Sequence, residues 1–376
     1  MLTLGLNLGE VTLSRAKGGG FNFADWRAQQ LDGIWIDYTD PDWLRQEVNG
    51  PTAVAAANDP IGLALSRRLA GQQGTLAGYL ASQPELWDHA TAGVTSPSSI
   101  LGVNDYRIQT SGADTGVFQT SIGGRYVIGR TYLVTFEMYD VVSGSIRVGN
   151  PASNSFSTPG VKQIFFKAPE ADIIIKRNSA CDIKIRNISV KEVSRSAATQ
   201  TGTSQRPRFD GSAGAIHDAF DDNTLTDYVL GAAPGVLIGK VRCPASLSGF
   251  QAFIGANASG NQRGLLGLNT DGRVGFGLGT ASAASITGGP DVRDQVCTII
   301  GAWDGTTGRA FVNGVQVAEV VQAGAPTATT PIRIGAWNND TTAFGFWAGR
   351  IFSAGAFRTA ALVDQALAQR IHNAII

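Results

Sequence analysis

Short runs of alternating apolar and polar residues, separated by glycine-rich turns, dominate this chain and restrict its fold class. The run GRTYLVTFEMYDV at 129–141 places four large side chains on one face: Tyr132, Val134, Phe136 and Met138. A period of two is the pattern of a β-strand with one buried face. Glycine contributes 47 of the 376 residues, and it supplies the positive φ angles that tight turns need. The sequence therefore predicts a mainly β chain.

The chain divides into three blocks and one linker. Residues 1–95 combine helical patterns with strand-like runs and predict a small mixed α/β N-terminal module. Residues 96–193 and 208–376 each contain several short strands with turn residues between them, so they predict two β-sandwich (jelly-roll) domains. Residues 194–207 contain no aromatic and no large aliphatic side chain, which indicates a linker.

Helix signals occur in the first block and at the C-terminus. Asp before Pro, at 40–41 and at 59–60, predicts capped helices over 41–48 and 58–71. We expect further helices over 74–83 and 359–374. The tryptophans of the first block form either an anchoring surface or buried core; they are Trp26, Trp35, Trp43 and Trp87.

Three strand patterns predict local detail. Residues 143–150 are expected to form the partner strand of 129–141. The apolar positions change parity between Ile185 and Ile188, which predicts a bulge or corner. Residues 263–279 predict a hairpin that turns at Asn269-Thr270-Asp271-Gly272.

Charge and cysteine content exclude several classes of protein. Thirty basic residues balance thirty acidic ones, which argues against nucleic acid as the main partner. No apolar run has the length of a membrane span, and the N-terminus lacks the pattern of a signal peptide, so we expect a chain made in a bacterial cytoplasm and not inserted in a membrane. Cys181, Cys243 and Cys297 have no CxxC spacing and are expected to be buried thiols.

The third block resembles the laminin-G or concanavalin-like jelly-roll family. The residues that carry the resemblance are IIGAWDGTTGRAFVNGV at 299–315, PIRIGAW at 331–337 and WAGRIFSAGAFRTAALVD at 347–364. The second block resembles carbohydrate-binding-module or galactose-binding-like sandwiches through GRTYLVTFEMYD at 129–140 and RNISVKEV at 186–193. Arg186 stands where that family commonly has Asp, which puts any role of that acid in doubt here.

The first block resembles an N-terminal module of phage structural proteins, through GIWIDYTDPDWLRQEVNG at 33–50, DPIGLALSRRLAG at 59–71 and DHATAG at 88–93. The order of the three blocks is similar to that in phage and gene-transfer-particle spike or fibre proteins. This resemblance implies a virion surface protein for host attachment, with other particle structural proteins and host-surface polysaccharide as partners. Weak single sugar sites would need several copies for avidity, so a homo-oligomer is expected.

Two loops of the third block are candidate binding sites. Laminin-G-like domains often bind calcium at one rim through Asp side chains, and calcium takes six to eight oxygen ligands. The candidate calcium ligands are Asp218, Asp221, Asp222 and Asp227; the alternative is a solvated loop. Sugar binding favours aromatic platforms beside amides and carboxylates, and this composition occurs at Trp337, Asn338, Asn339, Asp340 and Phe344. The alternative there is that Trp337 and Trp347 fill the core.

Nothing in the sequence indicates catalysis. A glycosidase of this fold needs two carboxylates that face one sugar, but the only Glu from residue 208 onward is Glu319. His89, His217 and His372 lie in no nucleophile motif. We therefore expect a glycan-binding spike or fibre protein and not an enzyme. The alternatives are a purely architectural decoration or spacer and, third, a polysaccharide-degrading enzyme.

Overall fold

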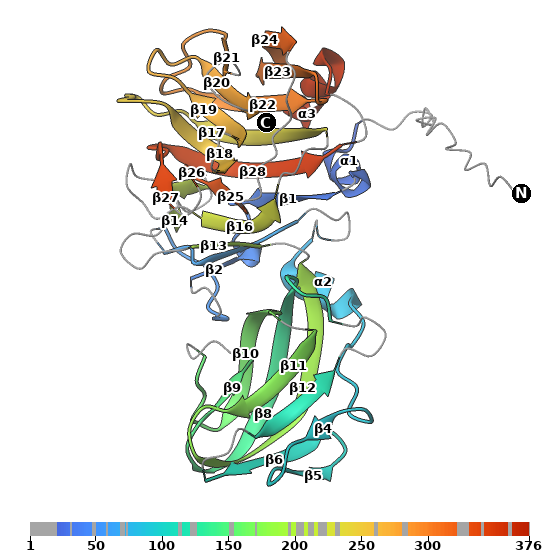
Figure 1. The fold of residues 1–376 in the computed structure, drawn as a ribbon. Coiled ribbons are helices and arrows are strands. Elements are labelled where there is room, and N and C mark those ends of the chain that lie inside the picture. The colour runs from blue at the N-terminus through green and yellow to red at the C-terminus, as the bar shows by residue number, and fades with distance from the viewer. Residues whose placement is uncertain are drawn as a thin grey trace, which may run out of the picture.

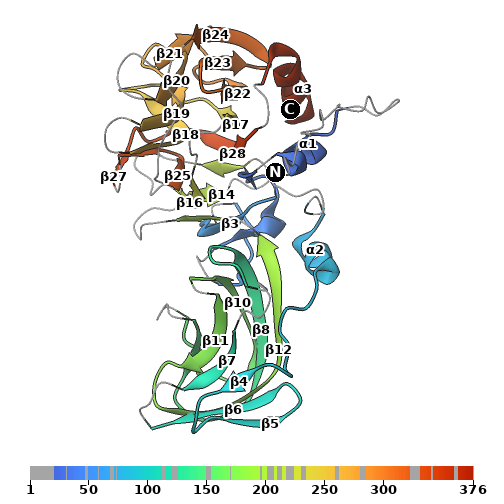
Figure 2. The same cartoon turned by 45° about the vertical axis from the view of Figure 1, so that its right-hand side comes forward.

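The computed structural model describes residues 21–30, 32–46, 50–57, 59–67, 72, 74–111, 115–120, 126–149, 154–169, 171–194, 197–200, 207–209, 214–216, 224–229, 234–258, 262–279, 285–321, 331–339, 342–359 and 363–375. These residues form two β-sandwiches arranged end to end (Figures 1 and 2). The helical elements are α1 (Phe23–Gln29), the 3-10 turn η1 (Pro41–Trp43), α2 (Leu76–Ser82) and α3 (Gln365–Ile375). The mainly β fold class is therefore confirmed. No described helix combines the length and apolarity needed to cross a membrane.

The larger sandwich consists of two antiparallel sheets. The first sheet has the order β14-β15-β28-β17-β22-β23-β24, and β1 also pairs with β28. Its strands are β1 (Asp32–Asp37), β14 (Arg208–Phe209), β15 (Ala215–Ile216), β17 (Gly235–Arg242), β22 (Val296–Trp303), β23 (Thr307–Val312), β24 (Val315–Val321) and β28 (Arg350–Arg358).

The second sheet has the order β2-β3-β13-β16-β25-β18-β19-β20-β21. Its strands are β2 (Leu44–Arg45), β3 (Leu63–Leu65), β13 (Ala197–Gln200), β16 (Thr224–Val229), β18 (Gln251–Ala258), β19 (Gln262–Leu268), β20 (Val274–Gly279), β21 (Ser285–Gly288) and β25 (Pro331–Ile334). Ile36, Phe253 and Phe276 belong to the core cluster between the two sheets. Part of the outer face of the first sheet is also buried, because Trp35 and Phe357 share a second apolar cluster with Ile371 of α3.

The smaller sandwich packs two sheets around a core of its own. One sheet has the order β10-β8-β12-β6-β5 and the other β4-β7-β11-β9. The strands are β4 (Gly93–Val94), β5 (Ser99–Gly102), β6 (Asp105–Thr110), β7 (Gly116–Thr120), β8 (Thr131–Ser143), β9 (Ile146–Val148), β10 (Gly160–Lys167), β11 (Asp172–Arg177) and β12 (Cys181–Ser194). The face predicted from residues 129–141 is buried as expected, since Tyr132, Val134, Phe136 and Met138 are each 0% exposed.

The smaller sandwich is inserted into the larger one. The chain leaves the second sheet at β3 and returns to it at β13, and these two strands pair with Leu65 opposite Ala197. Residues 1–95 were expected to form a separate module, but β1 pairs with β28 and β3 with β13. The reason is that β1 buries both faces, Ile36 in the inter-sheet core and Trp35 under the helices. The predicted linker 194–207 contains β13, and its residues 195–196 and 201–206 lie outside the described part.

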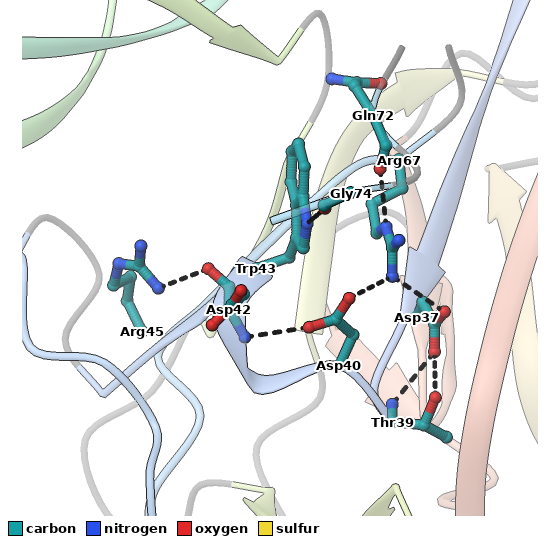
Figure 3. Close-up of polar contacts among 9 residues, drawn as sticks. All are labelled: Asp37, Thr39, Asp40, Asp42, Trp43, Arg45, Arg67, Gln72 and Gly74. Carbon is teal, nitrogen blue, oxygen red and sulfur yellow. Dashed lines mark hydrogen bonds and ion pairs between the residues drawn. The ribbon is translucent and has the colours of Figure 1, made fainter. Parts of the chain in front are cut away.

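Polar contacts and an apolar cluster together join the two sandwiches; Figure 3 shows part of the polar contacts. Arg67 forms ion pairs with Asp37 (3.2 Å) and Asp40 (2.6 Å), and its Nε donates to the carbonyl of Gln72 (2.9 Å). The Gln72 amide donates in turn to the carbonyl of Val193 in the smaller sandwich (3.0 Å). An apolar cluster at the same place contains side chains from both bodies: Trp43, Leu63, Leu65, Leu76, Tyr79, Phe165 and Val193.

Two helix predictions in the first block are wrong. Asp40 does cap Asp42, but only the single turn η1 forms before β2. Asp59 accepts hydrogen bonds from the N–H groups of Ala55 and Ala56, and the chain continues into β3. Strand pairing with β13, distant in the sequence, overrides the local capping signals because tertiary pairing outweighs weak propensities. The helix predicted at 74–83 is confirmed as α2, and the helix predicted at 359–374 is confirmed as α3 but begins only at Gln365.

The local predictions for the two sandwiches have mixed outcomes. The register of β12 against β8 shifts between Arg186 and Ser189, which confirms the predicted bulge. The hairpin over 263–279 is confirmed as β19 and β20. Residues 146–148 form β9, which pairs with β11 in the opposite sheet and not with β8, so that pairing was wrong. The three cysteines are buried free thiols, as expected.

Of the four tryptophans of the first block, three lie in cores. Trp35, Trp43 and Trp87 are at most 5% exposed, and Trp26 packs edge-on against Phe357. The buried-core alternative therefore accounts for these side chains.

Candidate functional site

The predicted sugar loop forms a short hairpin on the larger sandwich. Its strands are β26 (Trp337–Asn339) and β27 (Thr342–Phe344), which pair with Trp337 opposite Phe344. The side chains of Asn338, Asn339 and Phe344, and the whole of Asp340, lie outside the described part of the structure. Trp337 is therefore the residue of this set whose side chain can be placed.

Trp337 lines a pocket of about 200 Å³ beside the β19–β20 hairpin. The described lining consists of Phe250, Leu265, Asn269, Gly275, Phe276, Gly277 and Trp337. Leu265 stands opposite Gly277 in the register, while Leu266 is in the inter-sheet core. Because successive side chains on a strand alternate in direction, Leu265 and Gly277 lie on the outer face of the second sheet.

Two glycines of β20 keep the floor of this pocket open. A Cβ at Gly275 would lie 2.8 Å from Cε2 of Phe250 and 3.0 Å from Nδ2 of Asn269, so the ring and the amide converge above this position. At Gly277 a Cβ would only make ordinary contact with Leu265, at 3.6 Å. The close approach of Phe250 and Asn269 to the strand thus requires glycine at 275, whereas glycine at 277 simply leaves space.

The backbone of the hairpin is attached to β18 at both ends, and Gly345 lies close to the Trp337 indole. Gly345 follows β27 with φ of +54°, and a Cβ there would overlap Nε1 of Trp337. The carbonyl of Gly345 accepts a hydrogen bond from Ala252 in β18 (2.9 Å). Gly335 donates to the carbonyl of Phe253 (2.8 Å), so both ends of the hairpin are attached to the same strand. The indole therefore belongs to a hairpin whose two ends are hydrogen-bonded to β18.

Asn269 supplies the polar group of the pocket. Its backbone N–H donates to Arg273 across the β19–β20 turn (2.9 Å), and its Nδ2 donates to Oγ1 of Thr287 (3.0 Å). This bond fixes the amide plane, and Oδ1 can accept a hydrogen bond from a ligand hydroxyl. The lining residues placed by the structure include no charged side chain. Aromatic faces beside one amide suit a neutral, hydroxylated ring.

The alternative that Trp337 and Trp347 both fill the core holds for one of them. Trp347 is 0% exposed and packs edge-on against Phe253 at 5.6 Å between ring centroids. Trp337 lines the pocket instead.

Sequence reasoning missed the other pocket residues. Phe250 carried no recognisable signal, because it precedes β18 and meets Trp337 only in the folded sheet. Asn269 was assigned to the turn alone. The alternating glycines of VGFGLG at 274–279 were the available signal, since they remove every side chain from one face of β20.

The predicted calcium site stays a prediction. Asp218, Asp221 and Asp222 lie outside the described residues, and Asp227 lies in β16 with its side chain outside them. Elsewhere in the described ranges, no group of three or more His, Cys, Asp or Glu side chains could hold a metal ion.

Residues 241–366 match the sequence model of the Concanavalin A-like lectin/glucanases superfamily. No curated protein matches the chain. The CBM40 domain of the Ruminococcus gnavus IT-sialidase, bound to alpha2,6 sialyllactose, is similar over 38% of this chain and 84% of its own, at 19% identity and a TM-score of 0.32. The Trypanosoma rangeli sialidase in complex with the inhibitor DANA is similar over 48% of this chain and 30% of its own, at 11% identity and a TM-score of 0.36.

The family match covers most of the larger sandwich, including the Trp337 pocket, and the resemblance predicted for residues 208–376 is confirmed to this extent. The larger sandwich is therefore similar in sequence and architecture to lectin-like jelly rolls.

Proposed function

We propose that this chain is a glycan-binding surface protein of a phage-like particle and that the Trp337 pocket receives one neutral sugar unit of a host-envelope or capsule polysaccharide. The observation that carries the proposal is the pocket itself, in which Trp337, Phe250 and Asn269 surround a glycine floor. The proposed location on a virion rests on the resemblance of the three sequence blocks, in their order, to phage and gene-transfer-particle spike or fibre proteins. Other particle proteins, a homo-oligomeric state and calcium at the Asp218–Asp227 loop belong to the same proposal.

Binding without catalysis is part of the proposal. Glu319, the only glutamate after residue 208, forms an ion pair with Arg309 (2.7 Å) and accepts from Gln316 (3.0 Å). The Arg309 guanidinium lowers the pKa of this carboxyl, whereas the acid of a glycosidase needs a raised pKa. Its partners therefore support a structural role.

The test is binding of labelled full-length protein to intact bacterial cells, with purified capsule as competitor and with or without EDTA. We expect saturable binding that the competitor removes, and a loss of at least about tenfold in affinity for Trp337→Ala, since buried aromatic anchors carry much of a binding energy. Gly277→Ala narrows the pocket without a clash and should weaken binding as well. Gly74→Ala is the matched control, because a Cβ there meets nothing within 4 Å.

An architectural spacer is the second candidate, and the junction between the sandwiches favours it. Hydrogen bonds and an apolar cluster hold the two bodies end to end. This function predicts no saturable binding to any host cell and no effect of Trp337→Ala.

A further inference from the structure

A second and larger cavity lies on the opposite side of the larger sandwich, on the helix-covered face of the first sheet. Its volume is about 670 Å³, within the range usual for small-molecule sites. The start of α1 and the end of α3 border this cavity. Both helices lie on the side of the larger sandwich away from β27 (Figures 1 and 2). The described lining includes Arg27, Trp35, Asp37, Lys240, Phe352 and Ser353.

Three adjacent strands place a row of polar groups along this cavity. Asp37 of β1 stands opposite Ser353 of β28, and Ser353 stands opposite Lys240 of β17. Two residues earlier along β1, Trp35 is covered by the helices. The row therefore occupies the helix-facing side of the sheet at the point where its apolar cover ends.

A bulge turns an aromatic ring toward this row. The register of β17 against β28 passes from Lys240–Ser353 to Val241–Ile351, so Phe352 is the extra residue. The ammonium of Lys240 lies over the Phe352 ring, 5.5 Å from its centroid. Bulges that redirect a side chain are over-represented beside functional sites.

The described lining of the cavity contains two cationic side chains, Arg27 and Lys240, and one carboxylate, Asp37. The Arg27 guanidinium lies 4.9 Å from the ring centroids of both Phe23 and Trp35. Burial lowers the pKa of Arg27 to about 9, against the opposing effect of the Asp37 carboxylate. That carboxylate is shared, since it forms an ion pair with Arg67 and accepts from Oγ1 of Thr39 at 2.6 Å (Figure 3). Because Asp37 already pairs with Arg67, an anionic group of a ligand would complement the positive charge of this cavity.

The Ser353 hydroxyl adds a group suited to a ligand. Ser353 is 6% exposed, and none of its neighbours within the described ranges forms a hydrogen bond with Oγ. The hydroxyl borders the cavity, so it can donate a hydrogen bond to a hydroxyl or carboxylate oxygen of a ligand there.

We propose that this cavity binds a carboxylate-bearing sugar, with its carboxylate at Lys240, a polar contact at Ser353 and its ring against Phe352. This inference rests on the proposed glycan binding but uses a pocket separate from that of Trp337. One chain would then offer a neutral subsite and an acidic subsite on opposite faces of a single sandwich. A polysaccharide with uronic acid units would engage both kinds of site across neighbouring chains.

The experiment is a ligand-observed NMR titration of the full-length chain with D-glucuronate and D-galacturonate, each compared with its neutral hexose. We expect each acid to bind roughly tenfold or more tightly than its neutral partner, because a charge-assisted hydrogen bond contributes at least this factor. Lys240→Met should remove the preference for the acid, and Ser353→Ala should weaken acid binding several-fold. Lys162→Met is the matched control, since Lys162 lies on β10 of the smaller sandwich and contacts Thr158.

Four outcomes would overturn the proposal. The first is that neither acid binds the unaltered chain at millimolar concentration. The second is that the acids and their neutral hexoses bind with equal affinity. The third is that folded Lys240→Met retains full preference for the acid. The comparison of acid with hexose needs no variant, so it decides the question even if Lys240→Met fails to fold. If Trp337→Ala abolishes acid binding, the acid occupies the Trp337 pocket, and this inference fails while the proposed glycan binding stands.

Discussion

Strands β4 to β12 of the smaller sandwich follow one another in one stretch of chain, whereas the larger sandwich takes strands from both sides of that stretch. Their outer faces differ as well. The outer face of the β10-β8-β12-β6-β5 sheet carries cross-strand ion pairs, Arg186 with Glu137 (2.8 Å) and Arg107 with Asp182 (2.6 Å). The larger sandwich has pockets over glycines on one face and beside helices on the other.

The difference between these outer faces indicates which sandwich offers binding sites. Side chains that form ion pairs with one another across strands already have partners for their charges. Glycines and partial helix cover leave concave spaces with polar groups at their edges. Both candidate sites therefore belong to the body that is assembled from distant segments.

The largest expected effect tests that assembly. Ile36→Ala removes a fully buried side chain of β1 from the inter-sheet core, and such changes cost about 2–5 kcal/mol. We expect calorimetry to show a lower transition for the larger sandwich and an unchanged one for the smaller. Phe136→Ala, in the core of the smaller sandwich, should have the opposite pattern. If Ile36→Ala leaves the larger sandwich's transition in place, β1 does not belong to it.

A moderate effect is expected at the junction. Arg67→Met leaves the Asp37 and Asp40 carboxylates without their shared cation. Arg67 is only 8% exposed in its side chain, and the loss of charge-assisted bonds costs about 1.5–3 kcal/mol. Chemical denaturation of the full chain measures this loss. Arg309→Met, which breaks the more exposed pair with Glu319, is the control and should cost at most about 1 kcal/mol. Equal losses would contradict the structural importance of the junction.

The smallest effect concerns acid and the smaller sandwich. Arg186 lowers the pKa of Glu137, and Arg107 lowers that of Asp182. A carboxyl whose pKa is lowered by folding stabilises the fold above its ordinary pKa, here 4.5 for Glu and 3.8 for Asp, and this contribution is lost as the pH falls through the lowered value. Melting temperatures of the smaller sandwich should therefore fall below pH 4.5. Glu137→Gln should make this fall shallower, and an unchanged acid profile would contradict the pairing.

The sequence predicted the parts of the fold that depend on local pattern. The burial of Phe136 follows from alternation, and the bulge near Arg186 follows from a change of parity. It could not assign β1 to the larger sandwich, because the partner residues of Ile36 lie more than three hundred positions away. The same limit applies to the pockets. Trp337 was identified by residue type, but Phe250 meets it only through sheet pairing, and the row of Asp37, Ser353 and Lys240 depends on the register of three strands.

The pairing of Leu65 with Ala197 has an evolutionary consequence. The chain leaves and re-enters the larger sandwich on adjacent strands, so a short hairpin turn could close the gap where the smaller sandwich now stands. The smaller sandwich is thus an insertion whose two ends lie on neighbouring, paired strands of the larger sandwich. A lineage could lose it, duplicate it or exchange it for another module by recombination at these two strands, while the scaffold that carries both pockets is inherited unchanged.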